Sequence, residues 1–148
     1  MNSFNEIQTK EGYLQRLNLL TPASQARWGK MNVQQMLNHL NELFLTATGQ
    51  KAVKDSVGVK MLSIVVGGVF KKRIIHSKKP FPKGIGNAPL PAAADFETEK
   101  GLLVGSLLNC KPSQFTKKSL SVFGKMSPEL WDKFLVRQFE HHLSQFGV

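Results

Sequence analysis

The sequence predicts an all-α protein, an antiparallel four-helix bundle with a long proline-rich crossover. Apolar residues recur at three- and four-residue steps in at least four segments, which is the period of a buried helical stripe. Four of the seven prolines fall within residues 77–92, where they disfavour a helix. The 148 residues have the size of one ordinary domain. We therefore expect a single domain, residues 1–148, whose sites lie between facing helices.

Composition and charge limit the classes of function. Hydrophobic residues make up 41% and charged residues 20% of the chain, as in a globular protein. The protein is basic, with a formal net charge of +10, and no acidic residue falls between Asp55 and Asp95. No helix-turn-helix or RNA-binding strand motif accompanies these charges, so we expect no nucleic-acid partner. A non-catalytic binding module that holds an anionic partner on residues 71–83 remains the alternative function.

The single cysteine and the N-terminus indicate the compartment. Cys110 stands alone, which excludes an intramolecular disulfide and fits a small buried apolar residue. The first residues lack the charged start and apolar run of a signal peptide. A cytoplasmic location is therefore the default expectation.

The first helix and the loop after it are predicted from a short apolar pattern. The helix should end near Thr21–Pro22, and its packing residues are Tyr13, Leu14, Leu17 and Leu20. Trp28, followed by Gly29, is predicted to be a loop residue whose indole is buried in the core.

The second helix has clear start and stop signals. Asn32 is a favoured N-cap residue, and Gly49 is a natural stop. The predicted inner face consists of Val33, Met36, Leu37, Leu40, Leu43 and Phe44. His39 lies mid-helix beside this face, where an imidazole needs a hydrogen-bond partner or a metal.

The middle of the chain is predicted in less detail. Residues 57–75 fit a mostly buried helix, with a strand as the competing interpretation and a membrane-surface helix as a further alternative. The apolar run Met61 to Phe70 is too short to span a bilayer, so we expect no transmembrane segment. This run also offers a surface for a homodimer. Residues 77–92 should form an irregular crossover.

The third strongly predicted helix starts at Asp95. Its expected packing face consists of Phe96, Leu102, Leu103, Leu107 and Leu108, with Cys110 near its end. Residues 111–126 then form a connection that is extended in its middle.

The last helix, residues 127–148, contains the most informative pattern. Ser127 is a favoured N-cap and Pro128 suits the first helical position. The predicted buried stripe consists of Leu130, Phe134, Leu135 and Phe139. Gln138 and His142 are four residues apart and leave the same face, whereas His141 lies about 100° around the helix and should face elsewhere. Two nitrogen or oxygen donors on one face suggest a metal site, or the remains of one.

Four stretches resemble a known family. RWGKMNVQQMLNHL, KKPFPKG, FGKMSPELWDKF and EHHLSQFGV are similar to the DinB-like (YfiT-like) superfamily of metal-dependent four-helix-bundle proteins, and in particular to a branch known only as a domain of unknown function. The resemblance touches most of the chain from Trp28 to Val148, and its two end motifs are the more specific ones.

The resemblance implies a divalent metal ion, typically nickel or zinc, held by three histidines. One comes from the second helix and two, in an H-x-x-x-H pair, from the last. These positions fall on His39, Gln138 and His142, so a glutamine replaces one family histidine. A neutral carboxamide oxygen is a weaker donor to zinc or nickel than imidazole, and the substitution should lower metal affinity.

Two interpretations of this site therefore stay open. His39, Gln138 and His142 form either a hydrogen-bonded polar cluster without metal or a functional metal site. Glu42, one turn from His39, would act in the second case as a fourth ligand, an orienting group or a general base, and we take it as the candidate catalytic residue. The resemblance then implies a metal-dependent hydrolase or a thiol-dependent transferase acting on a small-molecule substrate.

Overall fold

The structure is a computed structural model that describes residues 2–52, 68–69, 95–116, 119–120 and 124–148. This part of the chain is mostly helical, as predicted. Its α-helices are α1 (Ile7–Asn18), α2 (Val33–Ala47), α4 (Phe96–Asn109) and α5 (Pro128–Gln145). A short 3-10 helix, η2, covers Pro112–Gln114.

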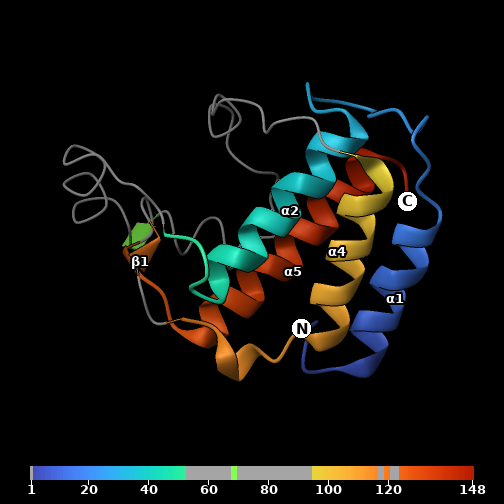
Figure 1. The fold of residues 1–148 in the computed structure, drawn as a ribbon. Helices are drawn as coiled ribbons and strands as arrows, with labels where there is room; N and C mark the ends of the chain where they lie inside the picture. The colour runs from blue at the N-terminus through green and yellow to red at the C-terminus, as the bar shows by residue number, and fades with distance from the viewer. Residues whose placement is uncertain (1, 53–67, 70–94, 117–118, 121–123) are drawn as a thin grey trace.

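The α-helices pack side by side (Figure 1). Helix α4 packs against both α1 and α2, and α5 also packs against both α1 and α2. The packing order is therefore a ring, α1–α4–α2–α5, which places α2 and α5 next to each other. Residues of α2 and α5 that point toward the partner helix can therefore meet.

The predicted caps of three helices are confirmed. Asn32 accepts a hydrogen bond from the Gln35 backbone N–H at 2.8 Å, and the Gln35 side chain accepts one from the Asn32 N–H at 3.0 Å. This reciprocal arrangement satisfies two donors at the start of α2. Asp95 and Ser127 cap α4 and α5 in the same position. Each of these helices therefore begins where the sequence indicates.

Helix ends differ from the prediction in one case. Helix α2 ends at Ala47, and Gly49 follows with a φ of 75°, a left-handed conformation that favours glycine. Helix α1 ends at Asn18, before the predicted boundary at Thr21–Pro22. Leu20 nevertheless remains buried beyond the end of α1, so the predicted packing positions hold.

The connection between α4 and α5 contains extended structure, as predicted. Strand β1 (Ser119–Leu120) pairs antiparallel with β2 (Gly124–Lys125), with Ser119 opposite Lys125. This two-residue ladder lies just before the N-cap of α5 (Figure 1).

The centre of the core is an aromatic cluster around a residue that lies before the first helix. The Phe4 ring lies 5.7 Å from the Tyr13 ring, 5.8 Å from Phe44 and 5.4 Å from Phe139, measured between centroids. Phe4 is fully buried. The Asp132 carboxylate accepts a hydrogen bond from the Phe4 backbone N–H at 2.9 Å. The N-terminal segment is therefore tied to α5 and packs against three helices.

The packing face of α4 agrees with the prediction at three positions and differs from it at two. Phe96, Leu103 and Leu107 are buried as expected, but Leu102 and Leu108 are exposed. The prediction for these two leucines is wrong. The inner face follows the spacing Phe96, Glu99, Leu103, Leu107 and Cys110, with a glutamate at an inward position. The buried Glu99 carboxylate is stabilised because Asn41 of α2 donates to it at 2.6 Å.

Trp28 is also placed differently from the prediction. Its side chain is 47% exposed rather than buried in the core. The loop is held by its backbone instead, since the Arg27 N–H donates to the Gln145 backbone oxygen at 2.7 Å. Trp28 therefore does not need a buried indole to stay in place.

Several predictions lie outside the described residues. They concern the helix or strand over 57–75, the dimer surface at Met61 to Phe70, the basic residues 71–83 and the crossover 77–92. Of these segments the structure describes only Gly68 and Val69, which are helical and exposed. No helix among the described residues is long and apolar enough to cross a bilayer.

Candidate functional site

Three of the predicted site residues lie together between α2 and α5. The imidazole rings of His39 and His142 are 4.9 Å apart, centroid to centroid, with an angle of 73° between their planes. The Gln138 side chain forms a hydrogen bond with His39. Gln138 and His142 are both buried, whereas His39 is half-buried. The four-residue spacing on α5 thus places both residues opposite the histidine of α2.

The surroundings favour uncharged imidazoles. The pKa of His142 is lowered to about 3, mainly by burial and also by the neighbouring His39 and His141, while a hydrogen bond to Gln145 acts in the opposite direction. Burial also lowers the pKa of His39, against the opposing effect of the hydrogen bond with Gln138. A neutral imidazole keeps an electron pair on one ring nitrogen, which is the form that binds a metal ion.

His141 belongs to the same neighbourhood, although it was predicted to face elsewhere. It is half-buried, and its ring lies 4.9 Å from the His142 ring and 6.3 Å from the Trp28 ring, each in an edge-to-face arrangement. The exposed indole of Trp28 therefore lies beside the histidine cluster. Burial lowers the pKa of His141 as well, and Arg137 adds to this effect.

Gln145 is a residue of this site that the sequence reasoning missed. Its side chain is buried, with Oε1 at 3.0 Å from His142 Nδ1 and Nε2 donating to the Trp28 backbone oxygen at 2.6 Å. The three-residue step from His142 to Gln145 was visible in the sequence as a same-face spacing. The contact with Trp28 was not, because it joins residues 117 positions apart.

Glu42 is not joined to the histidines in the structure. Its carboxylate forms an ion pair with the Lys51 ammonium group. Within the described residues, no hydrogen bond or ion pair links Glu42 to His39 or His142. The candidate general base, Glu42, therefore lies one turn from His39 on α2, but its carboxylate is paired with Lys51 rather than with a histidine.

The donor set for a metal ion combines two imidazoles with a carboxamide. Among the residues that the structure describes, no three His, Cys, Asp or Glu side chains converge in a way that could hold a metal ion. Gln138 is the third donor beside the two imidazoles. The set fits a nitrogen-preferring cation such as zinc or nickel at two positions and less well at the third.

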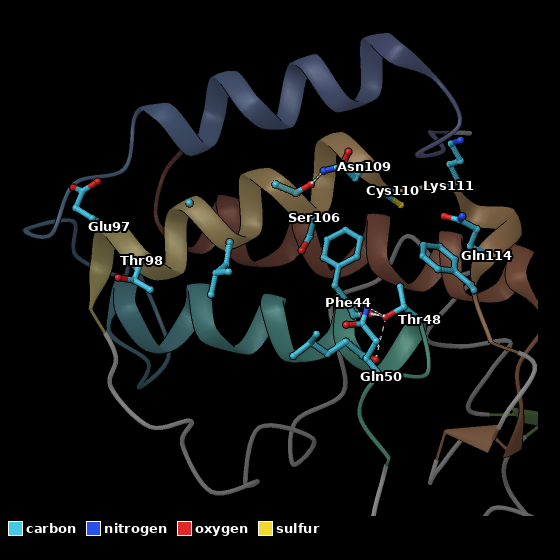
Figure 2. A pocket seen from close by; sticks show the side chains of 15 residues that line it. Phe44, Thr48, Gln50, Glu97, Thr98, Ser106, Asn109, Cys110, Lys111 and Gln114 are labelled. Atoms are coloured by element: carbon cyan, nitrogen blue, oxygen red, sulfur yellow. Dashed lines mark hydrogen bonds between the residues drawn. The ribbon is translucent and has the colours of Figure 1, made fainter.

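A separate cavity lies between α2 and α4 (Figure 2). It has a volume of about 630 Å³ and is lined by Phe44 and Thr48 of α2, by Ser106 and Asn109 of α4 and by Gln114 beyond α4, among others. None of the predicted site residues lines it. The thiol of Cys110 faces this region, and burial raises the pKa of the thiol to about 12, so it is a weak nucleophile at neutral pH.

Comparison of the chain with protein-family models, with curated proteins and with solved structures found no match.

Proposed function

We propose that His39 and His142, with Gln138 as a third donor, bind a divalent metal ion of the zinc or nickel type in an antiparallel four-helix bundle of the DinB-like kind. The observation that carries the proposal is the approach of the two imidazole rings to 4.9 Å across the α2–α5 contact.

The physical chemistry of the two rings supports this proposal. Both pKa values lie below the ordinary value for histidine, so no proton has to be displaced from a charged imidazole before a metal ion binds at neutral pH. Gln138 is the weak point of the set, since a carboxamide oxygen is a poorer donor for these ions. We therefore expect a weaker site than three imidazoles would make.

Metal-dependent chemistry would follow from an open position in such a site. A bound divalent ion with three protein ligands supplies acidity, since it lowers the pKa of a coordinated water or thiol. The proposed reaction classes are hydrolysis and thiol transfer on a small-molecule substrate. Glu42, one turn from His39, is the proposed proton acceptor, and its ion pair with Lys51 has to open for that role.

Metal titration of the tag-free, chelator-treated protein tests the proposal. We expect about one Zn²⁺ or Ni²⁺ per chain by calorimetry, and loss of this binding in His39→Ala and in His142→Ala. His141→Ala is the matched control, because it removes an imidazole from the same helix without removing a proposed ligand. Binding that survives both His39→Ala and His142→Ala would reject the site.

A further inference from the structure

We infer that Gln145 is a positioning residue of this site, which holds the His142 imidazole as the tautomer with its proton on Nδ1. The two hydrogen bonds of the Gln145 side chain carry this inference. One runs from Nε2 to the Trp28 backbone oxygen, at 2.6 Å, and the other joins Oε1 and His142 Nδ1, at 3.0 Å.

The tautomer follows from which atoms can donate. A backbone carbonyl oxygen only accepts hydrogen bonds, so the Gln145 group facing Trp28 must be the NH₂ group. The group facing His142 is then the amide oxygen, which also only accepts. His142 Nδ1 must therefore carry a proton, and in the neutral ring the electron pair is left on Nε2. Nε2 is thus the atom of His142 that can bind a metal ion.

The loop before α2 keeps the Gln145 amide in this orientation. The Arg27 N–H donates to the Gln145 backbone oxygen at 2.7 Å, so the loop binds both the main chain and the side chain of this residue. Gly29, the residue after Trp28, has a φ of 86°. A Cβ atom at Gly29 would lie 2.3 Å from Gln145 Nε2. The glycine is needed twice, for its backbone conformation and for the space that the amide occupies.

The loop at Trp28 and Gly29 therefore has a structural role that does not depend on the exposed indole. The Trp28 backbone oxygen orients the Gln145 amide, and the amide in turn orients the His142 imidazole. Partners of this kind fix the ring orientation of metal-binding histidines, and their loss typically lowers metal affinity by about 10- to 100-fold. The effect on metal affinity rests on the proposed function, whereas the assignment of the tautomer does not.

Nitrogen NMR of the imidazole side chains in the metal-free protein, at mildly alkaline pH, tests the tautomer directly. We expect the His142 ring of the unaltered protein to show the pattern of a proton on Nδ1. Gln145→Met keeps the side-chain volume but removes both hydrogen bonds, and we expect it to shift His142 toward the Nε2–H form. An Nε2–H ring in the unaltered protein, or an unchanged ring in Gln145→Met, would overturn the inference.

A pair of glycine variants tests the link through the loop. Gly29→Ala should displace the Gln145 amide and change the His142 pattern in the same direction. Gly124→Ala is the matched control, since Gly124 also has a positive φ, of 64°, but nothing lies within 4 Å of its added Cβ. We expect the control to share the backbone strain and to leave His142 unchanged. An equal response in both variants would count against the link.

Metal titration of the same variants separates this inference from the proposed function. If the unaltered protein binds Zn²⁺, Gln145→Met should bind it about 10- to 100-fold more weakly while keeping the same stoichiometry. If the unaltered protein shows the Nδ1–H ring and binds no metal ion, the proposed function fails and the positioning of His142 by Gln145 stands. If Gln145→Met binds Zn²⁺ as tightly as the unaltered protein, Gln145 does not contribute to metal affinity, and that part of the inference is rejected.

Discussion

The buried imidazole of His142 should make the stability of the protein depend on pH. Its pKa is about 3 in the folded state, against an ordinary value of 6.5. Between these two values the unfolded chain binds a proton that the folded chain does not, so the free energy of unfolding rises with pH across this window. The stability that the neutral His142 contributes is lost as the pH falls from 6.5 toward 3. The slope approaches about 1.4 kcal/mol per pH unit for one such group.

Chemical denaturation between pH 7 and 4 in the presence of a chelator measures this effect. We expect His142 to contribute a fall of about 3 kcal/mol over that range, because most of the window below the ordinary pKa of 6.5 is crossed. His142→Gln cannot take up a proton, so its stability should fall less steeply with acid than that of the unaltered protein. Parallel pH profiles for the two proteins would mean that His142 binds a proton in the folded protein as readily as in the unfolded chain. The imidazole would then be less buried than the structure indicates.

Gln138 decides how strongly the proposed site can bind a metal ion. Gln138→His would supply a third imidazole at the position that now offers a carboxamide. We expect Zn²⁺ and Ni²⁺ affinity to rise by at least about tenfold, equivalent to about 1.4 kcal/mol. Competition with a chromophoric chelator measures the change. Unchanged affinity would mean that position 138 does not face the metal.

The site was only partly predictable from single residues. His39, Gln138 and His142 follow from helical spacing together with the family resemblance, and the structure brings them together. Gln145 was missed because its partner Trp28 lies in a loop far away in the sequence. Helical periodicity relates residues within one element, and it carries no information about which loop carbonyl will reach a helix end.

Within the helices, α4 shows where a hydrophobic pattern fails. Its leucines come in adjacent pairs, 102–103 and 107–108, so periodicity alone does not say which member of each pair points inward. The inner face becomes clear only when Glu99 is known to be buried. From the sequence alone a glutamate is expected to face solvent, so this position was not assigned to the inner face. Asn41, which satisfies the buried carboxylate, is 58 residues away. Caps, by contrast, are local, and the sequence predicted them correctly.

The adjacent leucines provide a matched test of the α4 face. Leu103 is fully buried, whereas Leu102 is 56% exposed. Leu103→Ala should lower the free energy of unfolding by about 2 to 5 kcal/mol, because it removes buried methyl groups and leaves a cavity. Leu102→Ala should change it by less than about 1 kcal/mol. Denaturant titration of both variants measures the difference, and similar losses would mean that the described face of α4 is wrong.

For the molecule as a whole, the N-terminal segment joins helices that are distant in the sequence. Phe4 contacts aromatic rings of α1, α2 and α5. Asp132 anchors the same segment through the Phe4 N–H and through the Ser3 hydroxyl, which donates to the carboxylate at 2.5 Å. Neither contact could be predicted from the sequence, because Phe4 precedes the first periodic segment and Asp132 looks like an ordinary surface residue of an amphipathic helix.

Because Phe4 fills the centre of this packing, its truncation should weaken the whole fold rather than fray one end. We expect Phe4→Ala to lower the free energy of unfolding by about 3 to 5 kcal/mol. Ile7→Ala is the control, since Ile7 lies three residues further on and is 71% exposed; it should have little effect. Thermal unfolding followed by circular dichroism and by tryptophan fluorescence measures both variants. If Phe4 joins the helices into one cooperative unit, the two signals will shift together in Phe4→Ala, whereas an unchanged midpoint would place the N-terminal segment outside the core.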